Sequence, residues 1–145
     1  MDRIIKFRGL NSNNEWVYGD LTHDAPNSTA YYSEYSQRIH WINEKWHQCN
    51  QPVKNGTVGQ FINKLDKNNN EIYEDNIITH PLCVKEPHNA DEPCEHFVGI
   101  IQFEVDRGQY FAVNGKSNGY VIVMSEAYKF EIIGDKFHNP ELIKE

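Results

Sequence analysis

Apolar and polar residues alternate in short runs along most of the chain, a pattern typical of half-buried β-strands. The first two runs, 4–10 and 16–21, are separated by a polar turn and predict a hairpin. A third run, 39–42, leads through polar residues to Trp46, which predicts a second turn and a returning strand. Residues 48–56 do not alternate, so we expect a connector there.

Further strands are predicted beyond residue 57. The alternating runs lie at 57–65, 71–78, 97–105, 109–113, 120–124 and 130–133, with a single helical turn expected at 125–127. Short strands spaced by about 8–12 residues are typical of a small barrel. The sequence therefore predicts a mainly β fold, with a small N-terminal hairpin lobe over 1–56 and a barrel-like (SH3-like) part over 57–145.

The segment 79–96 is the least regular part of the chain. Pro81, Pro87 and Pro93 recur through it, and proline removes the backbone N–H that a central strand or a helix would use. We therefore predict a proline-rich loop inserted in the barrel-like part.

The polar centre of 57–79 resembles a calcium loop at first sight, because Asp66, Asn68 and Asn70 are spaced like the first oxygen ligands of an EF-hand. That loop also needs glycine at its sixth position and glutamate at its twelfth, where this chain has Glu71 and Ile77. Asn and Asp tolerate positive φ and bond to nearby backbone groups. We therefore predict a hairpin turn.

The same stretch, TVGQFINKLDKNNNEIYEDNII, resembles the signature of the YopX family, which comprises small proteins of phages and prophages. The segments IKFRG, VYGDL and FEIIGDKFHNPEL resemble other parts of the family pattern in the same order. The pattern has glycine where this chain has Asn63, Asn69 and Asp75. Asn and Asp are the usual substitutes at positive φ, so we expect the hairpins to persist. The resemblance implies a mainly β fold and a phage or prophage origin, and it implies no activity.

Charge and cysteine content limit the classes of function. The net charge is −7, and no two basic residues are adjacent, whereas sequence-independent binding of nucleic acid needs clustered positive charge. The three cysteines form an odd number, which fits a reducing compartment. The N-terminus has no signal-peptide pattern and no run is long enough to cross a membrane, so we expect a cytoplasmic location in the host cell and no membrane partner.

Cysteines and histidines gather in the predicted loop. Zinc is held tetrahedrally by thiolates and imidazoles, so one interpretation is a zinc site; its candidate ligands are Cys83, His88, Cys94 and His96. His80 lies beside this set. The other interpretation is a solvated loop without metal, since no C-x-x-C pair is present. On balance the sequence predicts no cofactor.

An aromatic-rich segment precedes residue 47. Its members are Tyr31, Tyr32, Tyr35, Trp41 and Trp46. These side chains suit the core of the smaller lobe, a surface for protein binding or self-association, or a stacking platform for single-stranded nucleic acid.

No motif of an established enzyme class occurs in the chain: it has no nucleophile elbow, P-loop, dinucleotide-binding turn or zinc-protease motif. We therefore expect a non-catalytic accessory protein that binds a host or phage protein, with a homo-oligomer as a further option. The alternative is a small β-barrel that binds nucleic acid. A metal-dependent enzyme that uses the cysteine–histidine loop is the third hypothesis.

Overall fold

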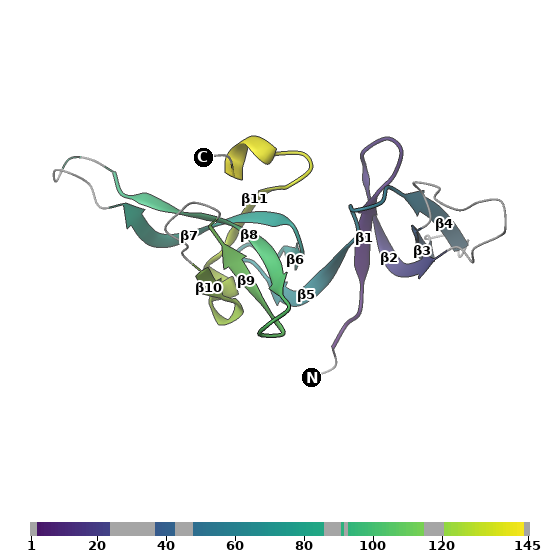
Figure 1. Ribbon diagram of the computed structural model, residues 1–145, viewed down its shortest axis with the longest axis horizontal. Coiled ribbons are helices and arrows are strands. Elements are labelled where there is room, and N and C mark those ends of the chain that lie inside the picture. Colours follow the sequence, from purple (N-terminus) through teal and green to yellow (C-terminus); the bar gives the residue numbers. More distant parts are fainter. Residues whose placement is uncertain are drawn as a thin grey trace. The chain divides into compact units, whose positions relative to one another are not determined.

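The computed structural model describes residues 3–23, 37–42, 48–85, 91, 93–114 and 121–143 (Figure 1). Nearly all regular structure in these residues is β. The strands are β1 (Phe7–Leu10), β2 (Trp16–His23), β3 (Gln37–Ile42), β4 (Gln48–Val53), β5 (Gly59–Leu65), β6 (Glu71–Tyr73), β7 (Asn76–Lys85), β8 (Glu95–Glu104), β9 (Gln109–Val113), β10 (Val121–Val123) and β11 (Glu131–Asp135). Two short 3₁₀ helices follow β10 and β11: η1 (Met124–Lys129) and η2 (Pro140–Ile143). The prediction of a mainly β fold is confirmed.

The chain divides into two compact units, Met1–Phe61 and Ile62–Glu145. Strand β5 begins in the first unit and ends in the second, so the division falls inside a strand. The predicted boundary between residues 56 and 57 lies shortly before this strand.

In the first unit the strands follow the order β4-β3-β2-β1-β5, and the pairs are antiparallel. The predicted hairpin is β1 with β2, where Phe7 lies opposite Gly19. Thr57 joins the segment before β5 to β1, since its Oγ1 accepts a hydrogen bond from the N–H of Leu10 at 3.1 Å. Gly9 is required for packing, because a Cβ atom there would lie 2.9 Å from the side chain of Val53.

Residues 48–53 form strand β4, so the prediction of a connector over 48–56 is wrong for this part. The polar sequence QCNQPV lacks the alternation by which strands are recognised. Strand β4 is the outermost strand of its sheet, where Pro52 is accepted because its missing N–H removes no hydrogen bond from a central ladder.

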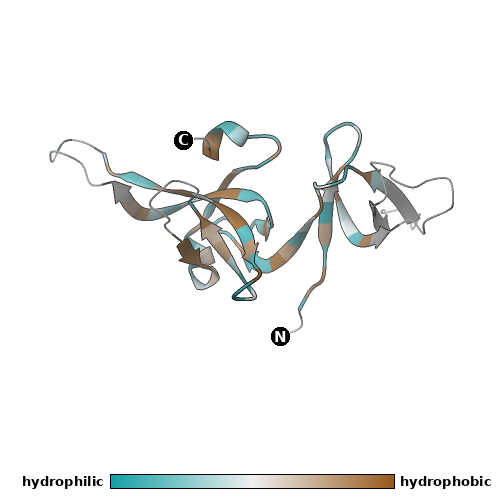
Figure 2. Cartoon of the chain, in the orientation of Figure 1, coloured by the Kyte–Doolittle hydropathy of each residue, from teal (hydrophilic) through white to brown (hydrophobic). Residues whose placement is uncertain are grey.

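The second unit contains a five-stranded antiparallel sheet in the order β10-β9-β8-β7-β11, and β5 pairs with β6. Hydrophobic and hydrophilic residues are interspersed along most of these strands, whereas β10 is apolar throughout (Figure 2). The inward-facing side chains form one core cluster of Ile62, Ile72, Ile78, Phe97, Ile101, Ala112, Ile122, Ala127 and Phe130. Within the described residues, β10 and β11 are the outer strands and do not pair with each other, so the sheet is open and the predicted barrel is not closed.

Strand β7 extends well into the predicted proline-rich loop. It runs to Lys85, and β8 begins at Glu95, so 79–85 and 95–96 are strand rather than loop. The pairing register shifts between His80 and Cys83. Pro81 lies in this irregularity, where the ladder is interrupted and a residue without a backbone N–H is tolerated.

The turn between β5 and β6 is organised by Asp66, whose side chain is buried. Its carboxylate accepts hydrogen bonds from the backbone N–H groups of Asn68 at 2.9 Å, Asn70 at 2.8 Å and Ile132 at 3.2 Å. The first two bonds close the turn and the third joins it to β11. The interpretation of this segment as a hairpin turn agrees with the structure, because Asp66 binds backbone groups within the fold.

Candidate functional site

The second unit has an open groove beside the end of β10. Its lining comes from β5, β9, β10 and η1, and comprises Ile62, Gln109, Tyr110, Val123, Met124 and Ser125. The groove has a volume of about 500 Å³, which is within the range of small-molecule and cofactor sites in proteins. Its floor is mostly apolar, whereas Gln109 and Ser125 offer an amide and a hydroxyl for hydrogen bonding.

Large apolar side chains are exposed on the strands around this groove. Val121 and Val123 on β10 are 44% and 47% exposed, and Phe103 on β8 is 45% exposed. Phe103 packs edge-on against Tyr110, with ring centroids 5.0 Å apart. The hydroxyl of Tyr110 lies 3.5 Å from Oε1 of Glu74. The aromatic ring in the groove is therefore held from two sides.

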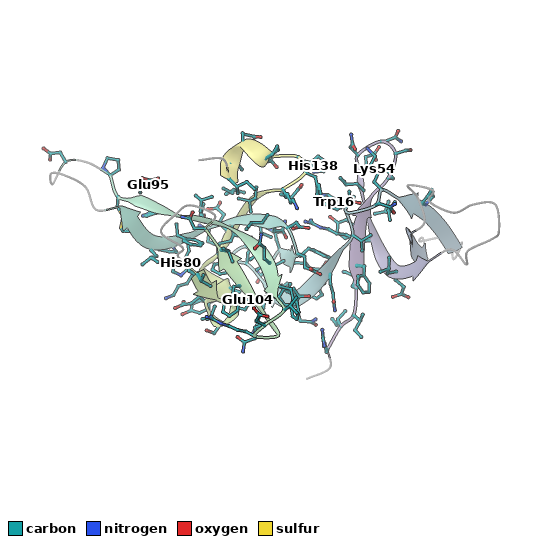
Figure 3. The ribbon with its side chains drawn as sticks, viewed as in Figure 1. Trp16, Lys54, His80, Glu95, Glu104 and His138 are labelled. Carbon is teal, nitrogen blue, oxygen red and sulfur yellow. A yellow bond between two sulfur atoms is a disulfide. The ribbon has the colours of Figure 1, made fainter. Side chains whose placement is uncertain are left out.

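Charged side chains lie next to the groove on η1. Lys129 Nζ lies 3.0 Å from Oε2 of Glu126, and His80 Nε2 lies 3.9 Å from the same oxygen. The hydrogen bond with Lys129 lowers the pKa of Glu126, and the hydrogen bond with Glu126 raises the pKa of Lys129. Nδ1 of His80 accepts a hydrogen bond from the N–H of Leu82 at 3.0 Å, which places the proton of a neutral ring on Nε2, toward Glu126. Figure 3 marks His80 on β7.

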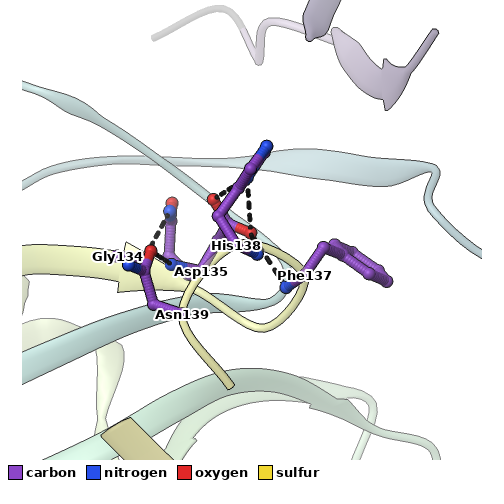
Figure 4. Close-up of polar contacts among 6 residues, drawn as sticks. Gly134, Asp135, Phe137, His138 and Asn139 are labelled. Atoms are coloured by element: carbon purple, nitrogen blue, oxygen red, sulfur yellow. Dashed lines mark hydrogen bonds and ion pairs between the residues drawn. The ribbon is translucent and has the colours of Figure 1, made fainter. Parts of the chain in front are cut away.

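A second polar cluster lies in the turn after β11 (Figure 4). The carboxylate of Asp135 is buried and accepts hydrogen bonds from the backbone N–H groups of Phe137 and His138, each at 2.9 Å. Nδ1 of His138 lies 2.9 Å from Oδ2 of Asp135. Asn139 Oδ1 accepts a hydrogen bond from the N–H of Asp135 at 3.2 Å. These contacts hold the turn that leads into η2, so the histidine–aspartate pair has a structural role.

Three of the four predicted zinc ligands are brought together by the β7–β8 hairpin. The possible ligand atoms of Cys83, Cys94 and His96 all lie within 4.8 Å of one another. The structure joins Cys83 and Cys94 in a disulfide, a pairing that the sequence did not predict. His88 lies outside the described residues.

The predicted aromatic surface falls mostly on residues that the structure does not describe. Tyr31, Tyr32, Tyr35 and Trp46 lie outside the described ranges, and for Trp41 only the backbone position in β3, opposite Cys49, is described. The aromatic surface therefore stays a prediction.

The groove was not predicted from the sequence. Its lining residues come from positions between 62 and 125, and only the packing of β5, β9 and η1 brings them together. The one available signal is the short run at 121–123, in which all three residues are apolar. A strand with one solvent-facing side would be expected to carry polar residues at Val121 and Val123.

In the part of the chain that the structure describes, no helix has both the length and the apolar character needed to cross a membrane.

The family model described as "YopX protein" matches residues 6–144. A crystal structure of protein EF1440 from Enterococcus faecalis is similar to this chain with a TM-score of 0.53 and 17% identity, covering 99% of this chain and 100% of that one. At this identity the likeness concerns the fold. No curated protein sequence matches the chain.

Proposed function

The chain belongs to the YopX family, and on this premise we propose that it is a non-catalytic accessory protein of a phage or prophage that acts in the host cytoplasm by binding another protein. The family resemblance supports the origin. The observation that carries the mode of action is the open apolar groove beside β10, with exposed valines next to it. Exposed apolar side chains gathered at a groove are typical of interaction sites.

The proposed ligand is an extended segment of a host or phage protein that carries a bulky apolar side chain. Strand β10 ends the five-stranded sheet, and no strand within the described ranges pairs with its outer edge. A segment that adds to such an edge gains backbone hydrogen bonds and places alternate side chains on one face. The groove at the end of β10 would then receive one apolar side chain, with Gln109 and Ser125 available to its backbone.

Charge favours a protein over nucleic acid as the partner. The net charge is −7, and beside the groove Glu126 is paired with Lys129. In the first unit, the guanidinium of Arg8 stacks on the ring of Trp16 at 3.9 Å, but Arg8 is buried. This cation therefore serves the packing of its own unit rather than a phosphate backbone.

The test is capture with a photo-crosslinking residue at position 121, the other exposed valine position of β10, followed by identification of the crosslinked peptide. Val123→Asp should abolish capture of the partner by the tagged protein, since a carboxylate in the groove opposes an apolar side chain. Val105→Asp is the matched control: Val105 is 82% exposed and lies outside the groove, so capture should persist.

Three results would contradict the proposal. The first is equal capture by both variants, which would place the binding surface elsewhere. The second is loss of all crosslinks after nuclease treatment, which would favour the nucleic-acid alternative. The third is a crosslink found only between two copies of this chain, which would assign the groove to self-association.

A further inference from the structure

The far end of the β7–β8 hairpin carries three metal-binding side chains, on the two strands and on the residue just before β8. Cys83 on β7 lies directly opposite His96 on β8 in the antiparallel register. Cys94 lies two residues before His96, and side chains two residues apart in extended chain point to the same face. The hairpin thus brings both sulfurs and the imidazole to one place, beside the register shift that follows Cys83.

These three groups are close and accessible. Their possible ligand atoms lie within 4.8 Å of one another, and the Cα atoms of Cys83 and Cys94 are 5.7 Å apart. Cys83 and His96 are exposed, and Cys94 is partly buried. In a tetrahedral zinc site with Zn–S of about 2.3 Å and Zn–N of about 2.0 Å, neighbouring ligand atoms are about 3.5–3.8 Å apart. After the sulfur–sulfur bond is broken, rotation about the Cα–Cβ bonds can adjust the three atoms to that spacing.

We propose that Cys83, Cys94 and His96 form a redox-dependent metal site, in which the two sulfurs are joined as a disulfide in the oxidised protein and bind a divalent zinc-type cation together with His96 in the reduced protein. The two states exclude each other, since a sulfur in a disulfide cannot act as a thiolate ligand. A cytoplasmic location would favour the reduced, metal-binding state.

The conversion requires a reductant, for which a dithiol is sufficient. One thiolate of the dithiol attacks a sulfur of the Cys83–Cys94 bond, which forms a mixed disulfide and releases the other cysteine as a thiolate. The second thiol of the dithiol then attacks the mixed disulfide and releases the remaining cysteine. The dithiol leaves as a disulfide, and two electrons and two protons have passed to the cysteines. Binding of Zn²⁺ then releases the two thiol protons, while neutral His96 donates a nitrogen lone pair. Water would complete a four-coordinate site.

The experiment is a Co²⁺ titration of the whole chain, reduced with a phosphine and kept free of oxygen. We expect one equivalent of Co²⁺ to give the sulfur-to-cobalt charge-transfer band and the intense visible bands of a tetrahedral site, and Zn²⁺ to remove them. Air-oxidised protein should give neither band. Peptide mapping without reductant should then show the Cys83–Cys94 link.

Variants separate this site from adventitious binding. Cys83→Ser, Cys94→Ser and His96→Gln should each weaken Co²⁺ binding by more than about 100-fold, because each removes a direct ligand. Cys49→Ser and His138→Gln, which alter a cysteine and a histidine elsewhere in the sequence, should leave the spectrum unchanged. Circular dichroism of each variant checks that the fold persists.

Two outcomes would overturn the proposal. Reduced protein that gives no charge-transfer band at equimolar Co²⁺ has no thiolate site. Bands that persist in His96→Gln, or that disappear in Cys49→Ser, would show that the ligands are different from those proposed here.

Discussion

Four residues with side chains in the described part of the chain, Asn14 among them, occupy backbone conformations that normally favour glycine. Asn63, Asn69 and Asp75 have φ of 61°, 64° and 69°, and these are the positions at which the YopX pattern has glycine. Asn and Asp adopt this region more readily than other residues with a Cβ atom. The expectation that Asn and Asp would replace glycine at positive φ is confirmed by the three angles, although Asn63 lies within β5 rather than in a turn.

A substitution series at Asn69 should reveal this conformational requirement. Asn69→Ala should lower the free energy of unfolding by about 1 kcal/mol, because alanine is disfavoured in the left-handed region. Asn69→Gly should change it by less than about 0.5 kcal/mol, since relief of strain is offset by a more flexible unfolded chain.

Urea denaturation measures this difference in free energy. The control is Asn68→Ala, a neighbouring exposed position without positive φ, which should be close to neutral. Equal loss for Asn69→Ala and Asn68→Ala would show that φ at position 69 does not limit stability.

At the scale of elements, strand β11 and the turn after it are fitted together through Gly134 and Asn139. A Cβ atom at Gly134 would come within 2.4 Å of Oδ1 of Asn139. That oxygen accepts the hydrogen bond from the N–H of Asp135. The absence of a side chain at 134 is therefore what allows the asparagine to close the turn.

A double-mutant cycle should detect this fit. Gly134→Ala should cost about 1–3 kcal/mol of unfolding free energy by overpacking, and Asn139→Ala about 1 kcal/mol by loss of a hydrogen bond. The double variant should cost clearly less than the sum, because alanine at 139 removes the atoms with which the new methyl group collides. Strict additivity in thermal or urea unfolding would contradict the predicted collision.

Helix η1 carries a pH-dependent contact. The pKa of Glu126 is lowered by its hydrogen bond with Lys129, so this contact contributes stability above the unfolded-state pKa of Glu126 and loses it as pH falls through the lower folded-state pKa. Lys129→Met should therefore raise the pKa of Glu126, measured by an NMR titration of its side-chain carboxyl. An unchanged titration curve in Lys129→Met would mean that Lys129 does not set this pKa.

The elements that the sequence predicted well are those whose apolar side chains alternate. Strand β9 was predicted at 109–113 and is found there, because its inward residues enter the core. Strand β4 and the end of β7 were not predicted, because Pro52 lies on an outer strand and Pro81 lies where the register shifts. Whether a strand tolerates proline at these two positions depends on its pairing with the neighbouring strand, and the local sequence does not show that pairing.

The sequence predicted the cysteine–histidine cluster but not the groove, because only the cluster is formed by residues that are near one another in the chain. Cys83, Cys94 and His96 are near in sequence and on one hairpin, so their spacing was enough to suggest that they meet. The groove joins Ile62 to Ser125 through tertiary packing, and no spacing in the chain indicates it.

At the scale of the whole molecule, each of the two units has its own buried residues. We therefore expect a core substitution in one unit to destabilise that unit and not the other. Ile101 is fully buried in the core cluster of the second unit, and Val53 is fully buried in the first. Ile101→Ala should lower stability by about 2–5 kcal/mol. Faster hydrogen exchange should appear in β7, β8 and β9, while β1 and β2 remain protected.

Val53→Ala is the reciprocal variant. We expect it to speed hydrogen exchange in the first unit alone. Mass spectrometry of peptic fragments reads both units in one experiment. Faster exchange throughout the chain after either substitution would show that the units unfold as one.

The Cys83–Cys94 bond also determines the product of a single proteolytic cleavage between the two cysteines. The two cysteines are separated by 11 positions and lie on either side of the segment that connects β7 to β8. A protease that cleaves one peptide bond between them leaves two fragments that are still one covalent molecule, heavier than the intact chain by one water. Only a reductant would separate them, so in the oxidised protein the two strands of this hairpin remain linked after the chain that connects them has been cut.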